Sequence, residues 1–216
     1  MRYHLFVLLL SLVSTVHAHS WSHDWVVEAE SSDSRVEFFG DTVGIRTPAG
    51  LTLWRKQPMS TPFTLTYEAM VVKNDSTERL SDLNCFFLAT DPASSDGNVF
   101  ERLAERHGVF ANCSQMQLYY VGYGGNWNTT TRFRRYNGQP NPPLLQEYTD
   151  SAHLLQANRW YRIRIEADDS RIRYYIDEEL LFEYSDPQPL HFGWFGFRTT
   201  WSHCLLRAFS ATFSTN

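Results

Sequence analysis

Short segments in which apolar and polar residues alternate recur along the whole chain, separated by glycine, proline, asparagine or aspartate. Alternation with a period of two predicts strands that bury one face of a sheet. About a dozen such segments in a chain of this size predict an all-β sandwich or barrel. The predicted strands are 25–29, 36–39, 42–46, 51–54, 63–72, 84–90, 116–123, 131–136, 160–166, 172–177, 180–184, 193–200 and 204–213.

Two segments depart from this pattern. Residues 98–106 predict one short helix, and residues 137–157 predict a long loop that contains Pro140, Pro142 and Pro143. Loops of this length in compact domains often form functional lids or rims. No linker, repeat or low-complexity run divides the chain, so we expect residues 19–216 to form a single domain.

Residues 160–184 predict a meander of three strands with two tight turns. Tyr161 and Ile163 share one face of the first of these strands, while Arg162 and Arg164 share the other. Arginines that alternate with a buried face are typical of a solvated sheet surface. We therefore interpret these two arginines as surface residues and not as part of a site.

Three other predicted strands place aromatic and hydrogen-bonding side chains together on one face. Met116, Leu118 and Tyr120 share one face of 115–123, and we expect the opposite face to be the polar one. A strand that buries one face normally exposes simple polar residues on the other, so these mixtures are unusual. The candidate binding residues are Gln117, Tyr119, Tyr123, Arg132, Arg134, Tyr136, Trp194, Arg198 and, directly after the third strand, Trp201 and His203.

A glycine-rich hairpin joins the first two of these strands, in the run YYVGYGGNWNTTTRFRRY. It places Asn126 beside Trp127 between two candidate strands. Pyranose rings stack on flat aromatic faces, and their hydroxyls need donors and acceptors at fixed positions. The pattern therefore predicts a saccharide site near this hairpin, although an ordinary surface turn has the same glycine content.

The composition limits the chemical class of partner that the protein can bind. Aromatic residues make up 15% of the chain, which excludes a disordered protein, and the net charge is −5. A chain with surplus negative charge is not expected to bind nucleic acid, because phosphates require surplus cation. Of the 19 basic residues, 17 are arginine, and arginine is the residue best suited to grip a carboxylate.

Residues 1–18 read as a secretory signal peptide, with Arg2 followed by an apolar run and Ala18 at the end. This segment is too short to span a membrane, and no later stretch is long and apolar enough, so we expect a secreted, extracellular or periplasmic monomer. Cleavage after Ala18 would expose His19 as a new N-terminus. An α-amino group beside imidazoles can bind copper, although a polar N-terminal stub explains the same residues.

No other cofactor is predicted. Asp96 and the pair Asp168 and Asp169 offer oxygen ligands for structural calcium, but no loop has the spacing of a calcium site. Cys85, Cys113 and Cys204 do not match a zinc pattern. In an oxidising compartment two of them could pair and leave one thiol, or they could be buried as small apolar residues.

The motifs together resemble those of a family of secreted concanavalin-like (laminarinase/lectin-type) proteins that are associated with polysaccharide utilisation, including pectin (rhamnogalacturonan) breakdown. The resemblance covers about Trp25 to Phe213 and implies a β-jelly-roll sandwich of two antiparallel sheets. It implies no particular reaction. The motifs are Trp25, Gly50-Leu51-Thr52-Leu53-Trp54, Tyr67-Glu68, Ser81-Asp82-Leu83-Asn84, Ala89-Thr90-Asp91-Pro92, the hairpin run above and Gly193-Trp194-Phe195-Gly196-Phe197-Arg198.

Three functions fit these residues, and we expect the first before the second and the second before the third. The first is a lyase that cleaves a uronic-acid-containing glycan by β-elimination, which needs a cation on the carboxylate and a base for the adjacent proton. The candidate clamp for this reaction is Arg132, Arg134 and Arg198. The candidate base or acid is Tyr120 or Tyr119, Tyr123 or His203, and Asn126 or Gln117 could assist. Asn84, and His107 after the short helix, are further candidates for binding the substrate.

The second function is a lectin-like module that binds an acidic polysaccharide or oligosaccharide without cleaving it. The third is a glycoside hydrolase, which needs two carboxylates that flank the scissile bond. The chain lacks the Glu-x-Asp-x-x-Glu strand that is common among concanavalin-like hydrolases. The isolated carboxylate candidates that remain are Glu68, Asp82, Asp91, Glu101 and Glu105. A sandwich fold hosts all three functions, so the fold alone does not decide between them.

Overall fold

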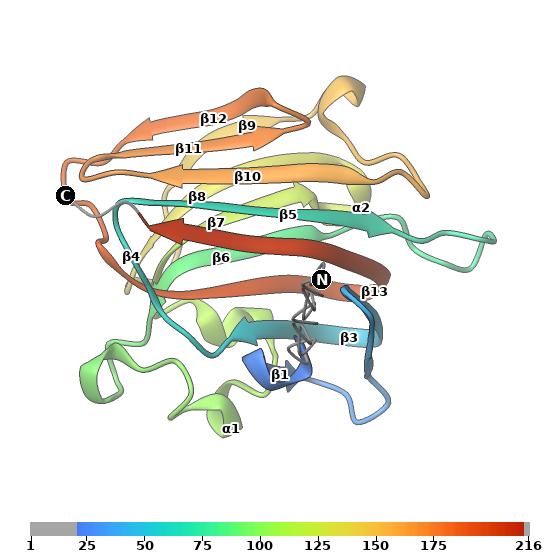
Figure 1. Ribbon diagram of the computed structural model, residues 1–216, viewed down its shortest axis with the longest axis horizontal. Helices are drawn as coiled ribbons and strands as arrows, with labels where there is room; N and C mark the ends of the chain where they lie inside the picture. Colours follow the sequence, from blue (N-terminus) through green and yellow to red (C-terminus); the bar gives the residue numbers. More distant parts are fainter. Residues whose placement is uncertain (1–20, 214–216) are drawn as a thin grey trace, which may run out of the picture.

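The alternating segments of the sequence form two packed antiparallel sheets in the computed structural model, which describes residues 21–213 (Figure 1). This confirms the predicted all-β sandwich. The predicted signal peptide, residues 1–18, and the predicted copper ligand His19 lie outside the described residues. No described helix is long and apolar enough to cross a membrane.

The first sheet contains, in spatial order, β1 (Trp25–Ala29), part of β3 (Thr42–Arg55), part of β13 (Phe192–Phe213), β6 (Leu83–Thr90), β7 (Gln117–Gly124), β8 (Thr130–Asn137) and β9 (Leu144–Tyr148). The second sheet contains β2 (Arg35–Phe39), the remaining parts of β3 and β13, β5 (Phe63–Val71), β10 (Tyr161–Ala167), β11 (Arg171–Ile176) and β12 (Glu179–Ser185). Figure 1 shows β5 and β10 to β12 as one layer in front of β6 to β9.

Short elements complete the chain. The two-residue strand β4 (Met59–Ser60) pairs with the start of β13. The helical turns are η1 (Trp21–Asp24), η2 (Ser95–Gly97), α1 (Leu103–Arg106), η3 (Phe110–Cys113), α2 (Gly125–Asn128) and η4 (Ser151–His153).

Strands β3 and β13 each run through both sheets. In the first sheet Gly196 of β13 pairs with Trp54 of β3, and in the second sheet Cys204 pairs with Ile45. The register shifts between Thr200 and Ser202, where β13 leaves one sheet for the other. The sequence predicted two separate strands in each case, because the residues at the crossing break the alternation.

The core between the sheets is rich in aromatic rings. Phe133 of the first sheet stacks on Phe182 of the second, with ring centroids 5.6 Å apart. Tyr67 of the second sheet meets Phe195 of the first edge to face at 5.5 Å. Aromatic pairs of this kind stabilise the fold by more than the burial of their surface area. Many of the aromatic residues of the chain are therefore used to build this core.

The outer face of the first sheet is also half buried. Residues 91–116, here called the covering segment, lie over it and enclose a second apolar cluster that includes Trp54, Phe86 and Trp194. The segment contains η2, α1 and η3, whereas the sequence predicted one helix over 98–106. Only Leu103–Arg106 is α-helical, and His107 ends it in the left-handed region with φ 49°.

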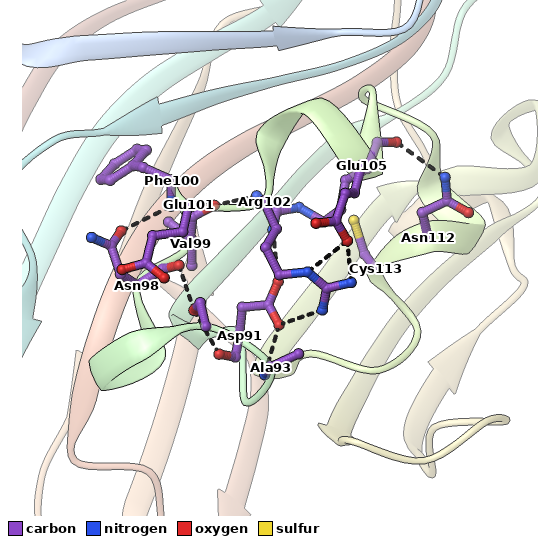
Figure 2. A network of polar contacts seen from close by, with 12 residues as sticks. Asp91, Ala93, Asn98, Val99, Phe100, Glu101, Arg102, Glu105, Asn112 and Cys113 are labelled. Carbon is purple, nitrogen blue, oxygen red and sulfur yellow. Dashed lines mark hydrogen bonds and ion pairs between the residues drawn. The ribbon is translucent and has the colours of Figure 1, made fainter.

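A buried group of charges fastens the covering segment to the sheet. Arg106 lies 2.9 Å from an Asp91 oxygen and 3.2 Å from an oxygen of Glu28 in β1. Trp54 Nε1 donates to Glu28 at 2.6 Å. All three charged residues are 4% exposed or less. At the edge of this group, Arg102 lies between Asp91 and Glu105 (Figure 2).

Two further predictions can be judged from the strands. The meander β10–β11–β12 forms as predicted, and Arg162 and Arg164 both pair with Glu178 at its surface, which confirms them as surface residues. The predicted loop 137–157 is not wholly irregular, because β9 within it adds an edge strand to β8. In β9 the two leucines are adjacent and the two polar residues follow together, so no alternation marked it as a strand.

We expect Arg106→Ala to lower the free energy of unfolding by about 3 kcal/mol or more, because it leaves Glu28 buried without a cation and Asp91 with only the partly exposed Arg102. Urea denaturation followed by tryptophan fluorescence measures this change. Arg102→Ala is the matched control, since Arg102 also contacts Asp91 but is partly exposed, and it should cost less than about 1 kcal/mol. Equal losses in the two variants would contradict a special role for the buried group.

All three cysteines are free and buried. Burial raises the pKa of the Cys85 thiol to about 12 and those of Cys113 and Cys204 to about 11. The thiolate is the reactive form, so we expect no reaction with Ellman's reagent in the folded protein at pH 8. The denatured protein should then release three equivalents; a single equivalent would show that two cysteines are paired.

Candidate functional site

A hollow of about 580 Å³ lies on the outer face of the first sheet, beside the covering segment. Its volume is in the range of small-molecule binding sites. We call it the arginine pocket, because four of its lining residues are arginines and one is a carboxylate. It is lined by Arg79, Asp82, Asn84, Phe110, Tyr120, Gly122, Gly125, Asn126, Thr130, Arg132, Arg134, Tyr136, Asn141, Pro142, Arg198 and Thr200.

Strand pairing brings the floor of the pocket together. Tyr120 of β7 pairs with Arg134 of β8, and Gly122 pairs with Arg132. Asn84 of β6 pairs with Gly122 on the other side and with Arg198 of β13. Residues paired in register place their side chains on the same face, so four neighbouring strands contribute to one surface.

Arg132 and Arg134 differ in their counter-charges. Arg132 pairs with Glu147 of β9. The Arg134 guanidinium instead donates to the carbonyl of Pro142 at 2.8 Å, and it forms no ion pair with a carboxylate in residues 21–213. Arg134 is half-buried and therefore offers a positive charge to the pocket.

Arg198 is 1% exposed and lies under the covering segment. Its guanidinium donates to the Gly108 carbonyl at 2.6 Å and to Thr52 Oγ1 at 3.2 Å, while Nε has no hydrogen-bond partner. No carboxylate of the described chain pairs with it. Burial lowers the pKa of this arginine from its usual value, as expected for a cation removed from water.

The covering segment can reach Arg198 only because residue 108 is glycine. Gly108 has φ +66°, and a Cβ there would lie 2.6 Å from the backbone nitrogen of Glu30. Its amide also donates to Glu28 at 3.2 Å. Because this loop lies so close to β1 and β3, the Gly108 carbonyl can accept a hydrogen bond from Arg198.

Asp82 and Asn84 form the polar corner of the pocket. Asn84 Nδ2 donates to Asp82 at 3.0 Å, and the Asn84 Oδ1 acceptor is buried without a partner. Arg79 pairs with the other Asp82 oxygen at 2.6 Å and donates to the carbonyl of Thr200, also at 2.6 Å. Asp82 adopts φ 67°, a left-handed conformation that is rare for residues other than glycine and that is often found at functional sites.

Tyr120 stands in the floor with its ring packed against Phe86, Phe110 and Tyr136. Burial raises its pKa well above the usual value, and the nearby Asp82 carboxylate raises it further. The Tyr120 hydroxyl is therefore protonated at neutral pH and can donate a hydrogen bond.

The structure brings together part of the set predicted from the sequence. The parity of every candidate strand is confirmed, and seven predicted residues line the pocket: Asn84, Tyr120, Asn126, Arg132, Arg134, Tyr136 and Arg198. The face assigned to β7 was wrong, however. Tyr119 and Tyr123 belong to the core between the sheets, where Tyr119 donates to Asp186 at 2.6 Å and Tyr123 packs on Tyr161.

The other predicted residues lie apart from the pocket. Gln117 borders a separate shallow hollow, and His107 is exposed at the end of α1. Trp194 is buried beneath the covering segment, where Nε1 donates to the Lys56 carbonyl at 3.1 Å. Trp127, Trp201 and His203 lie at the rim where β3 and β13 cross between sheets.

Several pocket residues were absent from the predicted set. Arg79 and Asn141 come from loops and Phe110 from the short turn η3, and none of these segments has a periodic signal in the sequence. Asp82 was predicted as an isolated carboxylate of a hydrolase and as part of the motif 81–84, and not as a binding residue. Within residues 21–213 no three His, Cys, Asp or Glu side chains gather to hold a metal ion.

Comparisons with known proteins agree with the fold. The model of the family described as "Domain of unknown function (DUF6250)" matches residues 45–209. No curated protein matches the sequence.

Many solved structures are similar in fold. The carbohydrate-binding module CBM66 from Bacillus subtilis is 13% identical with a TM-score of 0.58, over 87% of this chain and 94% of that one. The VIP36 exoplasmic/lumenal domain, in a form bound to Ca²⁺ and Man3GlcNAc, is 10% identical with a TM-score of 0.59, over 90% and 86%. A native glycosidic hydrolase is 11% identical with a TM-score of 0.55, over 90% and 92%. The fold is thus that of a concanavalin- or galectin-like sandwich.

We expect Gly122→Ala to destabilise the pocket floor. A Cβ at Gly122 would lie 2.5 Å from the Tyr120 hydroxyl, and the packed Tyr120 ring has little room to move. Overpacking of this kind costs about 1–3 kcal/mol, which urea denaturation can measure. Gly125→Ala is the control, because its nearest neighbour would be 3.7 Å away, and it should change stability by less than about 0.5 kcal/mol. Equal stability of the two variants would show that the Tyr120 ring moves freely.

Proposed function

Because the chain belongs to the DUF6250 family, whose description states no activity, we propose a function from the arginine pocket itself: the protein binds an acidic saccharide there. The carboxylate of a uronic acid unit lies against Arg134 and Arg198 in this proposal. The ring and hydroxyls of the sugar occupy the rest of the pocket.

The observation that carries this proposal is the surplus of positive charge in the pocket. Arg134 and Arg198 line it without a carboxylate partner among the described residues, and Arg198 is 1% exposed. A buried cation is costly unless an anion or several acceptors compensate it. The whole chain has a net charge of −5, so this local surplus runs against the average of the protein. An anionic ligand would compensate both arginines.

The remaining lining suits a sugar. The Tyr120 hydroxyl is a donor, Asn84 Oδ1 is a buried acceptor without a partner, and Asp82 accepts from Asn84 with capacity to spare. Phe110 and Tyr136 add apolar faces beside these groups. Alternating apolar and hydrogen-bonding surface is what a pyranose ring presents. The similarity in fold to a carbohydrate-binding module and to a glycan-bound lectin domain supports the same class of ligand.

Elimination is the second candidate, because Tyr120 and Arg134 meet in one pocket as a lyase requires. The raised pKa of Tyr120 favours a hydroxyl that donates over one that removes a proton. Tyr123 and His203, the other candidate bases, lie outside the pocket lining. Hydrolysis has less support, since Asp82 is the single carboxylate among the lining residues. These arrangements favour binding without cleavage.

The proposal also includes where the protein meets its ligand. We propose that the protein is exported by its N-terminal segment and meets plant or microbial polysaccharide outside the cell. Pectin-type chains rich in uronic acid are the first ligands to test, because they combine a carboxylate with pyranose rings.

We expect isothermal titration calorimetry to detect binding of uronate-containing oligosaccharides and not of neutral ones. Arg134→Ala should weaken this binding about tenfold or more, since hydrogen bonds to charged groups contribute about 1.5–3 kcal/mol. Raised salt should also weaken it. Arg171→Ala, at an exposed arginine of β11 far from the pocket lining, is the matched control and should bind normally.

The same mixtures should be followed by ultraviolet absorbance and by a reducing-end assay. Binding without new absorbance or reducing ends supports the binding function. An unsaturated product would favour the lyase, and reducing ends alone would favour the hydrolase. Equal affinity of Arg134→Ala and the unchanged protein would remove the carboxylate clamp.

A further inference from the structure

A second hollow of about 420 Å³ adjoins the arginine pocket at the point where β3 and β13 cross between the sheets. We call it the rim compartment; Arg46, Thr47, Glu78, Trp201 and His203 are among its lining residues. Arg79 borders both hollows, and the consecutive residues Thr200 and Trp201 line one each. The two hollows are therefore neighbours on one continuous surface.

Two exposed tryptophans stand at the junction. Trp127 is 60% exposed and Trp201 is 49% exposed, and their rings meet edge to face with centroids 5.3 Å apart. The guanidinium carbon of Arg79 lies 4.7 Å from the centre of the Trp127 ring. Arg79 in turn pairs with Asp82 in the arginine pocket. The same arginine thus fixes this pair of rings, here called the tryptophan platform, to the pocket.

The backbone under the platform is strained. Trp127 has φ 62° and Trp201 has φ 43°, both in the left-handed region that favours glycine. Asn126 and Asn128, on either side of Trp127, share this conformation, and Trp201 stands where the register of β13 shifts. A large aromatic residue at positive φ costs free energy, and an exposed ring regains little of it by burial. Stability alone therefore does not explain two tryptophans at these positions.

The charges of the rim compartment differ from those of the arginine pocket. Two acidic residues, Asp33 and Glu78, face two arginines, Arg46 and Arg79. Arg46 pairs with Glu78 at 3.3 Å. Both arginines of this compartment therefore have a carboxylate partner, Glu78 for Arg46 and Asp82 for Arg79, whereas the arginine pocket has a surplus of cations. A second carboxylate would find no uncompensated cation in this compartment.

We infer that the tryptophan platform and rim compartment form a second saccharide subsite, which takes a neutral sugar linked to the acidic unit in the arginine pocket. This inference rests on the proposed function of the pocket. It deepens that function, because the preferred ligand becomes a chain in which acidic and neutral sugars are joined. The neutral ring stacks on an exposed tryptophan face, and its hydroxyls reach the polar groups around Arg46 and Glu78.

The test compares three ligands by calorimetry: free galacturonate, digalacturonate, and an aldobiouronic acid in which one uronate is linked to one neutral hexose. We expect the aldobiouronic acid to bind about tenfold more tightly than free uronate and more tightly than digalacturonate. Trp127→Gly and Trp201→Gly should remove this gain and leave the binding of free uronate unchanged. Glycine is chosen because it accepts the positive φ at both positions, and thermal denaturation verifies that each variant folds.

Two controls sharpen the result. Phe192→Ala removes an exposed ring elsewhere on β13 and should keep the gain. Trp127→Phe keeps an aromatic face and should restore part of it. A gain that survives in both glycine variants would overturn the subsite, and an equal gain with digalacturonate would overturn its preference for a neutral sugar. Failure of every uronate ligand to bind the unchanged protein would instead overturn the proposed function of the arginine pocket.

Discussion

The buried contact of Arg106 with Glu28 and Asp91 is the interaction on which the pocket depends. Arg106 and Asp91 of the covering segment and Glu28 of β1 are removed from water together, and such a group is stable only when every partner is in place. It therefore admits one position of the covering segment over the first sheet. That position brings the Gly108 amide to Glu28 and the Gly108 carbonyl to Arg198. The wall of the pocket and the orientation of its most buried cation thus follow from one ion group.

The sequence predicted the strands well because burial on a sheet imposes a period of two. It predicted which residues share a face in β7, β8 and β13, but it placed Tyr119 and Tyr123 on the pocket side. The physical reason is that both faces of β7 are buried. One packs in the sandwich core, and the other lies partly beneath the covering segment. Alternation then separates the two faces without marking which one faces the core.

The residues of the site that lie outside the strands could not be predicted in this way. Arg79 and Phe110 reach the pocket through segments that have neither a period nor a local signature of their path. Their positions depend on contacts between residues far apart in the sequence, such as Arg79 with Thr200 and Gly108 with Glu28. The long β3 and β13 were divided in the prediction for a related reason, since a strand that changes sheets must break its alternation where it crosses.

The passage of β13 through both sheets also bears on how the protein comes to be made. Trp54 of β3 pairs with Gly196, and Leu65 of β5 pairs with Ala211, and both partners are in β13. Each sheet therefore lacks its central strand until β13 has been added. The meander β10–β12 can form from neighbouring residues, but neither half of the sandwich closes until β13 is available to pair. Contacts of such long sequence separation slow folding and leave apolar edges open meanwhile. The fold, and Arg198 with it, is thus acquired only once β13 can pair in both sheets.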